Sequence, residues 1–526
     1  MKTTRKVFAI ALSLVMVFAL AISAFAANEY SITIDNKAPN HVYEAYQIFA
    51  GDLSTNAEGT KVLSNITWGS GVDQVKLVDG KTVSDVFAGQ TAEEIAAGLK
   101  TEDDAKAFAA KVAPYLKNAK ASAAQANDKY VISGLDAGYY LVKDQNNTLQ
   151  DKDDFYTAYI MKVVADVSAA PKGDKPSLDK QIKHNESGTW GVVGDNQIGD
   201  TVEFRTITTV PDTTGYDTYV YKIHDTMSVG LTSNVSTAAD ITIKVNDAEI
   251  LDAKYYTVTA NGNSFTVNVD ILAAINDGVL AKNDSLYTYY TGVLNADAKV
   301  YDEGKQENVA YLEYSNNPND EGTGRTKEVK VYDWTFKMSV NKVDENGNAL
   351  TGAKFVLSKN GALKVSDLNC NAEGIPTNTA DLIALVKVSD GVYRVATDKD
   401  EAATIVYDID AGNVVINGLD DAITYYLYET KAPEGYNLLK TPVEFKITAE
   451  YNADGASLKT GSPTVTVGAG EPSATLSTDV VNNSGSTLPE TGGIGTTIFY
   501  IAGALLVVAA GIILVTRKRM SSKTKA

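Results

Sequence analysis

The chain has 526 residues and an acidic balance, with 66 Asp and Glu against 47 Lys and Arg. This charge argues against nucleic acid and anionic membrane surfaces as partners, because both repel an acidic protein. A single cysteine, Cys370, excludes internal disulfides, and its thiol is expected to be buried or in a loop. A chain of this length is too long to fold around one hydrophobic core. It predicts about three domains, since domains have roughly 100 to 200 residues.

The first 26 residues have the pattern of an export signal. Three basic residues precede an apolar stretch from Val7 to Ile22, and the small residues Ala24 and Ala26 follow it. Signal peptidase requires small residues of this kind at its cleavage site. The sequence therefore predicts a secreted protein whose mature chain begins near Ala27.

Short alternating runs of apolar and polar residues recur between Gly, Asn and Asp turns. Val202–Thr208 and Val443–Ile447 are examples, and such runs indicate strands with one buried face. Ala92–Lys117 differs, because Ala, Leu, Glu and Lys crowd there and predict a helix. The fold class expected is all-β, in tandem sandwich domains, with a helical insertion in the first domain.

A weak internal repeat helps to place the domains. Ile132–Leu141 reappears as Ile416–Asp420 followed by Tyr425–Leu427, so the first and last domains share a strand and its entry turn. Pro-, Gly- or Asn-rich segments mark three boundaries, at Pro171–Pro176, Asn316–Lys327 and Asn482–Thr487. The predicted parts are a signal peptide (1–26), domains at 27–170, 171–328 and 329–487, and a C-terminal segment (488–526).

The C-terminal segment has three features in a fixed order. They are the pentapeptide Leu488-Pro489-Glu490-Thr491-Gly492, the apolar run Ile498–Val515 and the basic cluster Arg517-Lys518-Arg519. The run is long enough to cross most of a bilayer, and the basic cluster is expected on the cytoplasmic side. A plain tail-anchored membrane protein is the alternative.

The pentapeptide resembles the LPxTG signal that sortases recognise in Gram-positive surface proteins. The resemblance implies cleavage between Thr491 and Gly492 and transfer of the new acyl end to an amine. Removal of the signal peptide and of the residues after Thr491 would leave 39 basic against 66 acidic residues, a mature charge of −27.

The third domain carries four motifs: Val340–Gly347, Leu350–Phe355, Tyr426–Tyr436 and Val480–Asn482. Together they resemble a Cna-B-type immunoglobulin-like domain, and the whole chain resembles the three-domain major pilins that sortases assemble. The resemblance implies an internal isopeptide bond between Lys342 and Asn482, with Glu429 as the acid. Asn483 is the alternative acceptor. The plainer interpretation is that Lys342 lies on the surface and Glu429 pairs with Lys431.

These residue types suit that chemistry. Burial disfavours the ammonium form of a lysine and so frees a nucleophilic amine. A buried carboxylic acid stays protonated and can pass a proton to departing ammonia. A bond between the first and last strands would close nearly the whole domain into one covalent loop, as a disulfide does.

The middle domain offers the same three residue types. Lys180 lies on its predicted first strand, and Asp225 lies in a segment that resembles the one where middle domains of these pilins carry an aspartate. We expect Asn316 as the acceptor, because it follows its strand as Asn482 does, with Asn317 and Asn308 as alternatives.

The first domain lacks this set. Lys143 stands where the third domain has Glu429, and the opening strand Tyr30–Ile34 contains no lysine. No isopeptide bond is expected there, and Asp144 is interpreted as a solvated turn residue.

Polymerisation needs an amine on the neighbouring subunit. Pilins of this family carry it in a Tyr-Pro-Lys-Asn-type motif between the first two domains. Pro171-Lys172 matches that motif, although Ala170 and Gly173 replace the aromatic residue and the asparagine. The resemblance therefore indicates a linkage from Thr491 to Lys172 of the next subunit, with Lys175 as the alternative.

No metal site or cofactor is expected. The three histidines, His41, His184 and His224, are widely separated. Asp344, Asn346 and Asn348 superficially suggest a calcium loop, but no glutamate follows at the twelfth position and a tight hairpin turn fits better.

Two functional classes remain. The favoured one is the shaft subunit of a covalent, cell-wall-anchored pilus on the cell surface, not an enzyme apart from its self-catalysed bonds. The expected partners are pilus-specific and housekeeping sortases, identical subunits, ancillary tip or basal pilins and peptidoglycan. The alternative is a monomeric wall-anchored adhesin in which the first domain binds a host surface ligand.

Overall fold

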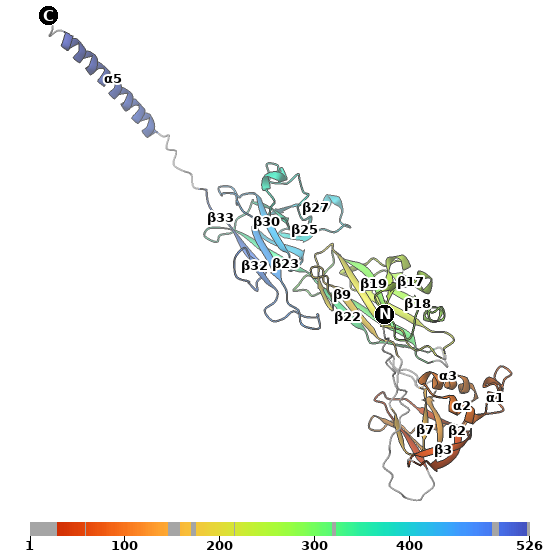
Figure 1. The fold of residues 1–526 in the computed structure, drawn as a ribbon. Helices are drawn as coiled ribbons and strands as arrows, with labels where there is room; N and C mark the ends of the chain where they lie inside the picture. The colour runs from red at the N-terminus through yellow and green to blue at the C-terminus, as the bar shows by residue number, and fades with distance from the viewer. Residues whose placement is uncertain are drawn as a thin grey trace, which may run out of the picture. The chain divides into compact units, whose positions relative to one another are not determined.

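The computed structural model describes residues 29–57, 59–145, 158–169, 175–214, 216–317, 322–485 and 494–522. The predicted signal peptide, Lys172 and the pentapeptide with Thr491 lie outside these residues. The described part contains six β-sheets, which form three pairs in chain order (Figure 1). The predicted all-β class is confirmed.

The first pair of sheets covers residues 30–169. The sheet orders are β5-β1-β8 and β3-β2-β6-β7, and β4 pairs with β2. Buried side chains of both sheets, among them Ile32, Tyr43, Ile132 and Val142, form one core between them. The strands are β1 (Tyr30–Asp35), β2 (Tyr43–Thr55), β3 (Lys61–Trp68), β4 (Lys120–Ala121), β5 (Lys129–Leu135), β6 (Gly138–Asp144), β7 (Ala158–Val163) and β8 (Val167–Ala169).

The predicted helical insertion is confirmed, but it is divided. The helices are α1 (Val83–Val86), α2 (Ala92–Gly98), α3 (Glu102–Val112) and the 3₁₀ helix η1 (Ala113–Tyr115). Gly98 ends α2, and the Thr101 side chain accepts a hydrogen bond from Asp104 N, which starts α3. Phe108 and Val112 of α3 pack with Phe49 and Leu141 of the second sheet, so that sheet is buried on both faces. Helices α2 and α3 lie beside the strands of this sheet (Figure 1).

The second pair of sheets forms the middle domain. Its orders are β10-β9-β12-β19-β15-β16, with β14 on β19, and β11-β22-β20-β13-β18-β17, with β21 on β20. The strands are β9 (Leu178–Lys183), β10 (Trp190–Gly191), β11 (Val193–Asp195), β12 (Thr201–Thr209), β13 (Tyr221–Met227), β14 (Leu231–Ser233), β15 (Thr242–Val245), β16 (Glu249–Ile250), β17 (Tyr256–Asn261), β18 (Ser264–Val269), β19 (Ser285–Leu294), β20 (Gln306–Ser315), β21 (Thr323–Arg325) and β22 (Val329–Trp334).

Short helices complete the middle domain, namely η2 (Ala238–Asp240), η3 (Ala253–Tyr255) and α4 (Ile271–Asn276). Its second boundary differs from the predicted one. The segment after Asn316 contains β21, which pairs back onto β20, and β22 then adds to the same sheet. The polar residues therefore belong to a connection within the domain, and the domain continues past residue 328 to about Phe336.

The third pair of sheets has the orders β27-β25-β26-β29-β23-β33 and β28-β24-β30-β31-β32. The first strand, β23, runs parallel to the last strand, β33. The strands are β23 (Phe336–Asp344), β24 (Lys354–Ser358), β25 (Leu385–Ser389), β26 (Val392–Val395), β27 (Ile405–Val406), β28 (Asp408–Asp410), β29 (Asn413–Leu419), β30 (Thr424–Lys431), β31 (Val443–Thr448), β32 (Thr464–Val467) and β33 (Ser477–Asn482), with the 3₁₀ helices η4 (Val365–Leu368) and η5 (Ala402–Thr404).

The chain divides into two compact units. The first contains the residues up to Phe336 together with Gly418–Asp421 and Ala449–Ser462, and the second contains the rest. Hydrogen bonds hold Gly418–Asp421 in the first unit: Ile198 N donates to Gly418 O at 3.0 Å, and Thr335 Oγ1 donates to Leu419 O at 3.1 Å. Two loops of the last domain are therefore described with the first unit.

The C-terminal apolar run is helical, as predicted. Helix α5 (Ile494–Ser522) includes a stretch, Ile498–Met520, with a mean hydropathy of 2.8. Among the described residues it is the one helix long and apolar enough to cross a membrane.

Candidate isopeptide sites

In the last domain, the three predicted site residues come from three strands. Lys342 lies on β23, Glu429 on β30 and Asn482 at the end of β33. Lys342 pairs with Val480 across the parallel ladder, so Asn482 stands two residues further along on the same face. All three side chains are buried, with exposed fractions of 0%, 1% and 0%.

Hydrogen bonds fix the acid and the amide of this cluster. Glu429 Oε2 accepts from Asn482 Nδ2 at 3.0 Å and from Leu439 N at 2.8 Å. Asn482 Nδ2 also donates to Asn437 O at 2.9 Å. The Lys342 amine donates to Val480 O at 2.9 Å. The amine, acid and amide therefore share one buried site, and the interpretation of Lys342 as a surface lysine is wrong.

Burial also shifts the pKa values of the amine and the acid. It lowers the pKa of Lys342 and raises the pKa of Glu429, because each charged form loses its hydration inside the sandwich. Both shifts favour the neutral amine and the protonated acid. Asn483, the alternative acceptor, is exposed and lies outside this cluster.

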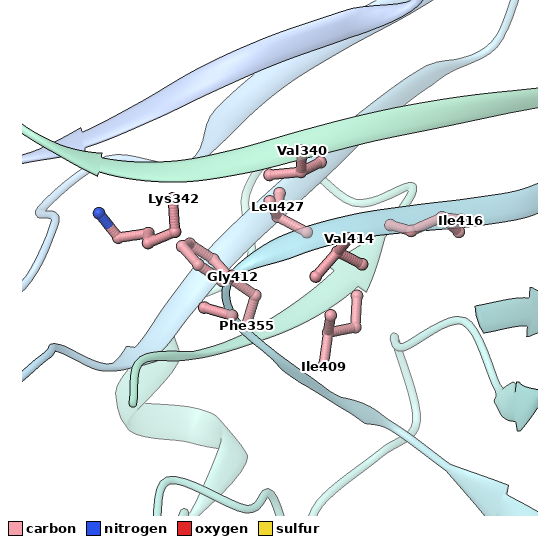
Figure 2. Close-up of a pocket in the computed structure, with 9 residues that line it drawn as sticks. Val340, Lys342, Phe355, Ile409, Gly412, Val414, Ile416 and Leu427 are labelled. Atoms are coloured by element: carbon pink, nitrogen blue, oxygen red, sulfur yellow. The ribbon is translucent and has the colours of Figure 1, made fainter. Parts of the chain in front are cut away.

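Apolar side chains surround the stem of Lys342. A small cavity beside it is lined by Val340, Phe355, Val414, Ile416 and Leu427, among others. Figure 2 shows Lys342 at one end of this cavity, with its nitrogen pointing away from the other lining residues. The aliphatic part of the lysine thus completes the core, while its amine reaches the polar cluster.

In the middle domain, Lys180 of β9 and Asp225 of β13 face each other across the two sheets. Both are buried and in direct contact, and the Tyr290 hydroxyl of β19 contacts both. Burial lowers the pKa of Lys180 and raises the pKa of Asp225. Phe204 and Tyr290 place their rings 5.9 and 5.1 Å from the Lys180 amine.

The asparagine in this cluster is Asn308 and not Asn316, the expected acceptor. Asn308 is 1% exposed, and its Nδ2 lies 3.4 Å from Tyr290 Oη. Asp225 pairs with Ala310 in the antiparallel β13–β20 ladder, which puts Asn308 two residues away. Asn316 lies eight residues beyond Asn308, or about 26 Å along an extended strand. Asn317 is also beyond the end of β20.

We expected Asn316 because Asn482 stands at the end of its strand. The asparagine strands of the two domains, however, pair differently with their neighbours. β33 is parallel to its lysine strand and presents an asparagine at its end, whereas β20 is antiparallel to its aspartate strand and presents one near its start. Tyr290 belongs to this cluster as well, and no motif in the sequence had indicated it. Its place on the buried side of the alternating strand Ser285–Leu294, between Leu286 and Leu294, could have indicated it.

The first domain has no such cluster among its described residues. Lys143, at the place of Glu429, is partly exposed and lies 3.5 Å from Glu44. The buried lysines in the described part of the chain are Lys180 and Lys342. Asp144, however, is not a solvated turn residue: it ends β6, is fully buried and forms a hydrogen bond with His41, with 2.7 Å between its Oδ1 and His41 Nδ1.

Two further predictions concern turns and the thiol. The predicted turn at Asp344 is present, because Asp344 Oδ1 accepts from Asn346 N and Asn348 N, both at 2.8 Å. Cys370 is partly buried, and burial raises the pKa of its thiol.

The predicted linkage residues, Lys172 and Thr491, lie outside the described residues, whereas Lys175 is described and exposed.

Comparisons with known proteins agree with this architecture. Residues 336–459 match the family model of a prealbumin-like fold domain, and residues 480–522 match that of the LPXTG cell wall anchor motif. The chain is therefore a cell-wall-anchored surface protein of the Gram-positive type, built from β-sandwich domains.

The relatives are fimbrial or surface proteins. A fimbrial subunit type 1 of Actinomyces viscosus is 38% identical over 20% of this chain and 18% of its own length. The trypsin-resistant surface T6 protein of Streptococcus pyogenes is 25% identical over 67% of this chain and 70% of its own length. The solved structure of the full-length major pilin SpaD of Corynebacterium diphtheriae aligns with a TM-score of 0.45 and 16% sequence identity. The alignment covers 87% of this chain and 98% of the SpaD chain. The match to the anchor motif includes the predicted pentapeptide, and the sequence relatives are a fimbrial subunit and a surface protein.

Proposed function

We propose that this protein is the repeating shaft subunit of a covalent pilus, stabilised by one internal Lys–Asn bond in each of its last two domains. The observation that carries the proposal is the burial of two lysines, each beside an acid and an asparagine, in a chain with an LPXTG anchor. A buried, unmodified lysine is costly to a fold, and an amide bond removes that cost.

In the last domain, the neutral Lys342 amine attacks the side-chain carbonyl carbon of Asn482. Burial raises the pKa of Glu429, and in its protonated form it donates a hydrogen bond to the amide oxygen and then passes protons between nitrogens. The new bond joins Nζ to Cγ, the bond from Cγ to Nδ2 breaks, and one ammonia leaves. The Asn437 carbonyl, which accepts from Nδ2, orients the leaving group.

In the middle domain the same reaction joins Lys180 to Asn308, with Asp225 as the acid. This bond would link the two sheets, because β9 lies in one and β20 in the other. Tyr290 contacts the amine and the acid and lies beside the amide, so it positions all three groups.

Assembly uses a different lysine. Sortase would cleave after Thr491 and hold its carbonyl as an acyl-enzyme, which the amine of Lys172 on another subunit would resolve. Lys180 and Lys342 are buried and so inaccessible to an enzyme. A housekeeping sortase would transfer the last subunit to peptidoglycan, and ancillary pilins would cap the tip or the base.

A monomeric adhesin is the second candidate, because the same anchor and sandwich domains would serve as a stalk. Cell-wall extracts boiled in SDS separate the two functions. The shaft predicts a ladder of covalent multimers that disappears in a strain without the pilus sortase. A single monomeric species in wild-type extracts would favour the adhesin.

A further inference from the structure

A second group of buried polar residues lies away from both isopeptide clusters, in the first compact unit. Carboxylate oxygens of Glu186, Asp195, Asp420 and Asp421 all lie within 4.8 Å of one another. Asp195 ends β11, and Asp420 and Asp421 follow β29 in the loop that belongs to this unit. Residues far apart in the sequence therefore converge on one point.

Three of these carboxylates are buried. Asp195 and Asp420 are 0% exposed and Asp421 is 4% exposed, while Glu186 is exposed and closes the group toward solvent. Isolated carboxylates at such separations repel one another strongly away from water. His184 Nε2, 3.3 Å from Asp195 Oδ2, can balance one of the charges at most.

Asp195 and Asp421 each accept a hydrogen bond through one carboxylate oxygen, and the second oxygen of each can bind a ligand. Asp195 Oδ2 accepts from the Tyr451 hydroxyl at 3.0 Å, and Asp421 Oδ2 accepts from Ala449 N at 2.7 Å. The other oxygens, Asp195 Oδ1 and Asp421 Oδ1, are buried and have no hydrogen-bond donor within the described residues. Buried oxygens of this kind are rare unless a proton or a cation satisfies them.

We propose that Glu186, Asp195, Asp420 and Asp421 form a binding site for a divalent cation of the hard, oxygen-preferring kind, with Ca²⁺ as the expected ion. Ca²⁺ binds oxygen ligands at about 2.3–2.6 Å, so two oxygens on one ion are separated by at most about 5 Å. The separations in this cluster meet that limit. An exported protein also meets Ca²⁺ outside the cell, where weak sites fill.

Without a cation, burial and mutual repulsion raise the pKa of Asp420 to about 9 and that of Asp421 to about 8. Protons are therefore the competing occupants of the cluster. None of these residues belongs to either isopeptide cluster, so the cation site does not depend on the cross-links.

The test uses the mature chain without its membrane helix, residues 27–491, which contains every described sandwich. After treatment with EDTA, the protein is titrated with CaCl₂, and separately with MgCl₂, by calorimetry and by thermal unfolding. Terbium luminescence sensitised by Tyr451 gives a local readout, since its hydroxyl contacts Asp195. We expect one Ca²⁺ per chain, a higher unfolding temperature in Ca²⁺, and displacement of Tb³⁺ by Ca²⁺.

Asp421→Asn is the diagnostic variant. Its amide oxygen can keep the hydrogen bond from Ala449 N, while its NH₂ group replaces the available oxygen with a donor. Ca²⁺ affinity should fall at least about tenfold. Asp410→Asn is the matched control, because Asp410 already pairs with Lys354 and Lys387, and its Ca²⁺ affinity should equal that of the wild type.

Absence of Ca²⁺ and Mg²⁺ binding by folded wild-type protein at millimolar concentrations would overturn the proposal and leave protons as the occupants. Equal Ca²⁺ affinities for Asp421→Asn and wild type would overturn it as well. The wild-type titration decides the matter even if the variant does not fold.

Discussion

The side-chain amide of Asn308 lies 3.4 Å from the hydroxyl of Tyr290 in the core of the middle domain. That hydroxyl also contacts Lys180 and Asp225, so four side chains from four strands meet at one point. The last domain assembles its amine, acid and amide without a tyrosine in that role, through Leu439 N and Asn437 O. The two domains therefore bring an amine, an acid and an amide together through different supporting groups.

The acceptor in the middle domain is the first point to test. Wild-type residues 27–491 should have an intact mass lower than the sequence mass by two ammonia molecules. Asn308→Ala should lose only one ammonia, because Lys180 then has no amide to attack. Asn316→Ala is the matched control and should still lose two. The opposite pattern would restore Asn316 as the acceptor.

Tyr290→Phe tests the positioning role of the hydroxyl. The ring stays and keeps its packing against Phe204 and Phe265, so the domain should fold. The lost hydrogen bond is worth about 1.4 kcal/mol. If it is lost from the transition state, the middle-domain bond should form about tenfold more slowly. Mass spectrometry of freshly folded protein over time measures this. The last-domain bond serves as the internal control, and equal rates in variant and wild type would exclude a positioning role.

Glu429→Gln should prevent the bond in the last domain, because an amide cannot relay the proton as a carboxylic acid does. The unlinked domain loses the constraint of a loop that spans nearly all its residues, which is worth about 5 kcal/mol in chain entropy. In thermal unfolding, the transition of the last domain should occur at a lower temperature than in the wild type. Asn482→Ala should show the same lower transition and the same missing bond. Asn483→Ala, at an exposed neighbour, should leave mass and unfolding unchanged; a lost bond there would contradict the assignment.

Lys172→Ala should abolish the covalent ladder and leave both internal bonds and the wall anchoring of monomers intact. The reason is that Lys172 supplies only the amine for the next subunit. Lys175→Ala, three residues away and exposed, should retain the ladder. The linkage would be assigned to Lys175 instead if the Lys172 variant still formed ladders and the Lys175 variant did not.

The sequence predicted the last-domain site more completely than the middle one. Lys342, Glu429 and Asn482 each stand in a local motif, and each motif corresponds to one strand. Lys180 and Asp225 were also predicted, but the choice among Asn308, Asn316 and Asn317 depends on the register of β20 against β13. Pairing register is a property of the folded sheets, and local patterns do not determine it.

Other features lay beyond local patterns for the same reason. Asp144 resembled a turn residue because its partner, His41, lies 103 residues earlier in the chain. The cluster around Asp195 and Asp421 joins two residues that are 226 positions apart in the sequence. The predicted boundary at residue 328 followed polar composition, whereas β22 continues the middle-domain sheet after it.

The central claim is that subunits are joined from Thr491 of one to a lysine of the next. Tandem mass spectrometry of proteolysed polymers from cell walls tests it most directly. We predict a branched peptide in which the Thr491 carboxyl carbon is bonded to the Lys172 side-chain nitrogen. Polymers or wall extracts that contain Thr491 only on peptidoglycan, with no Thr–Lys linkage, would contradict the shaft and favour the monomeric adhesin.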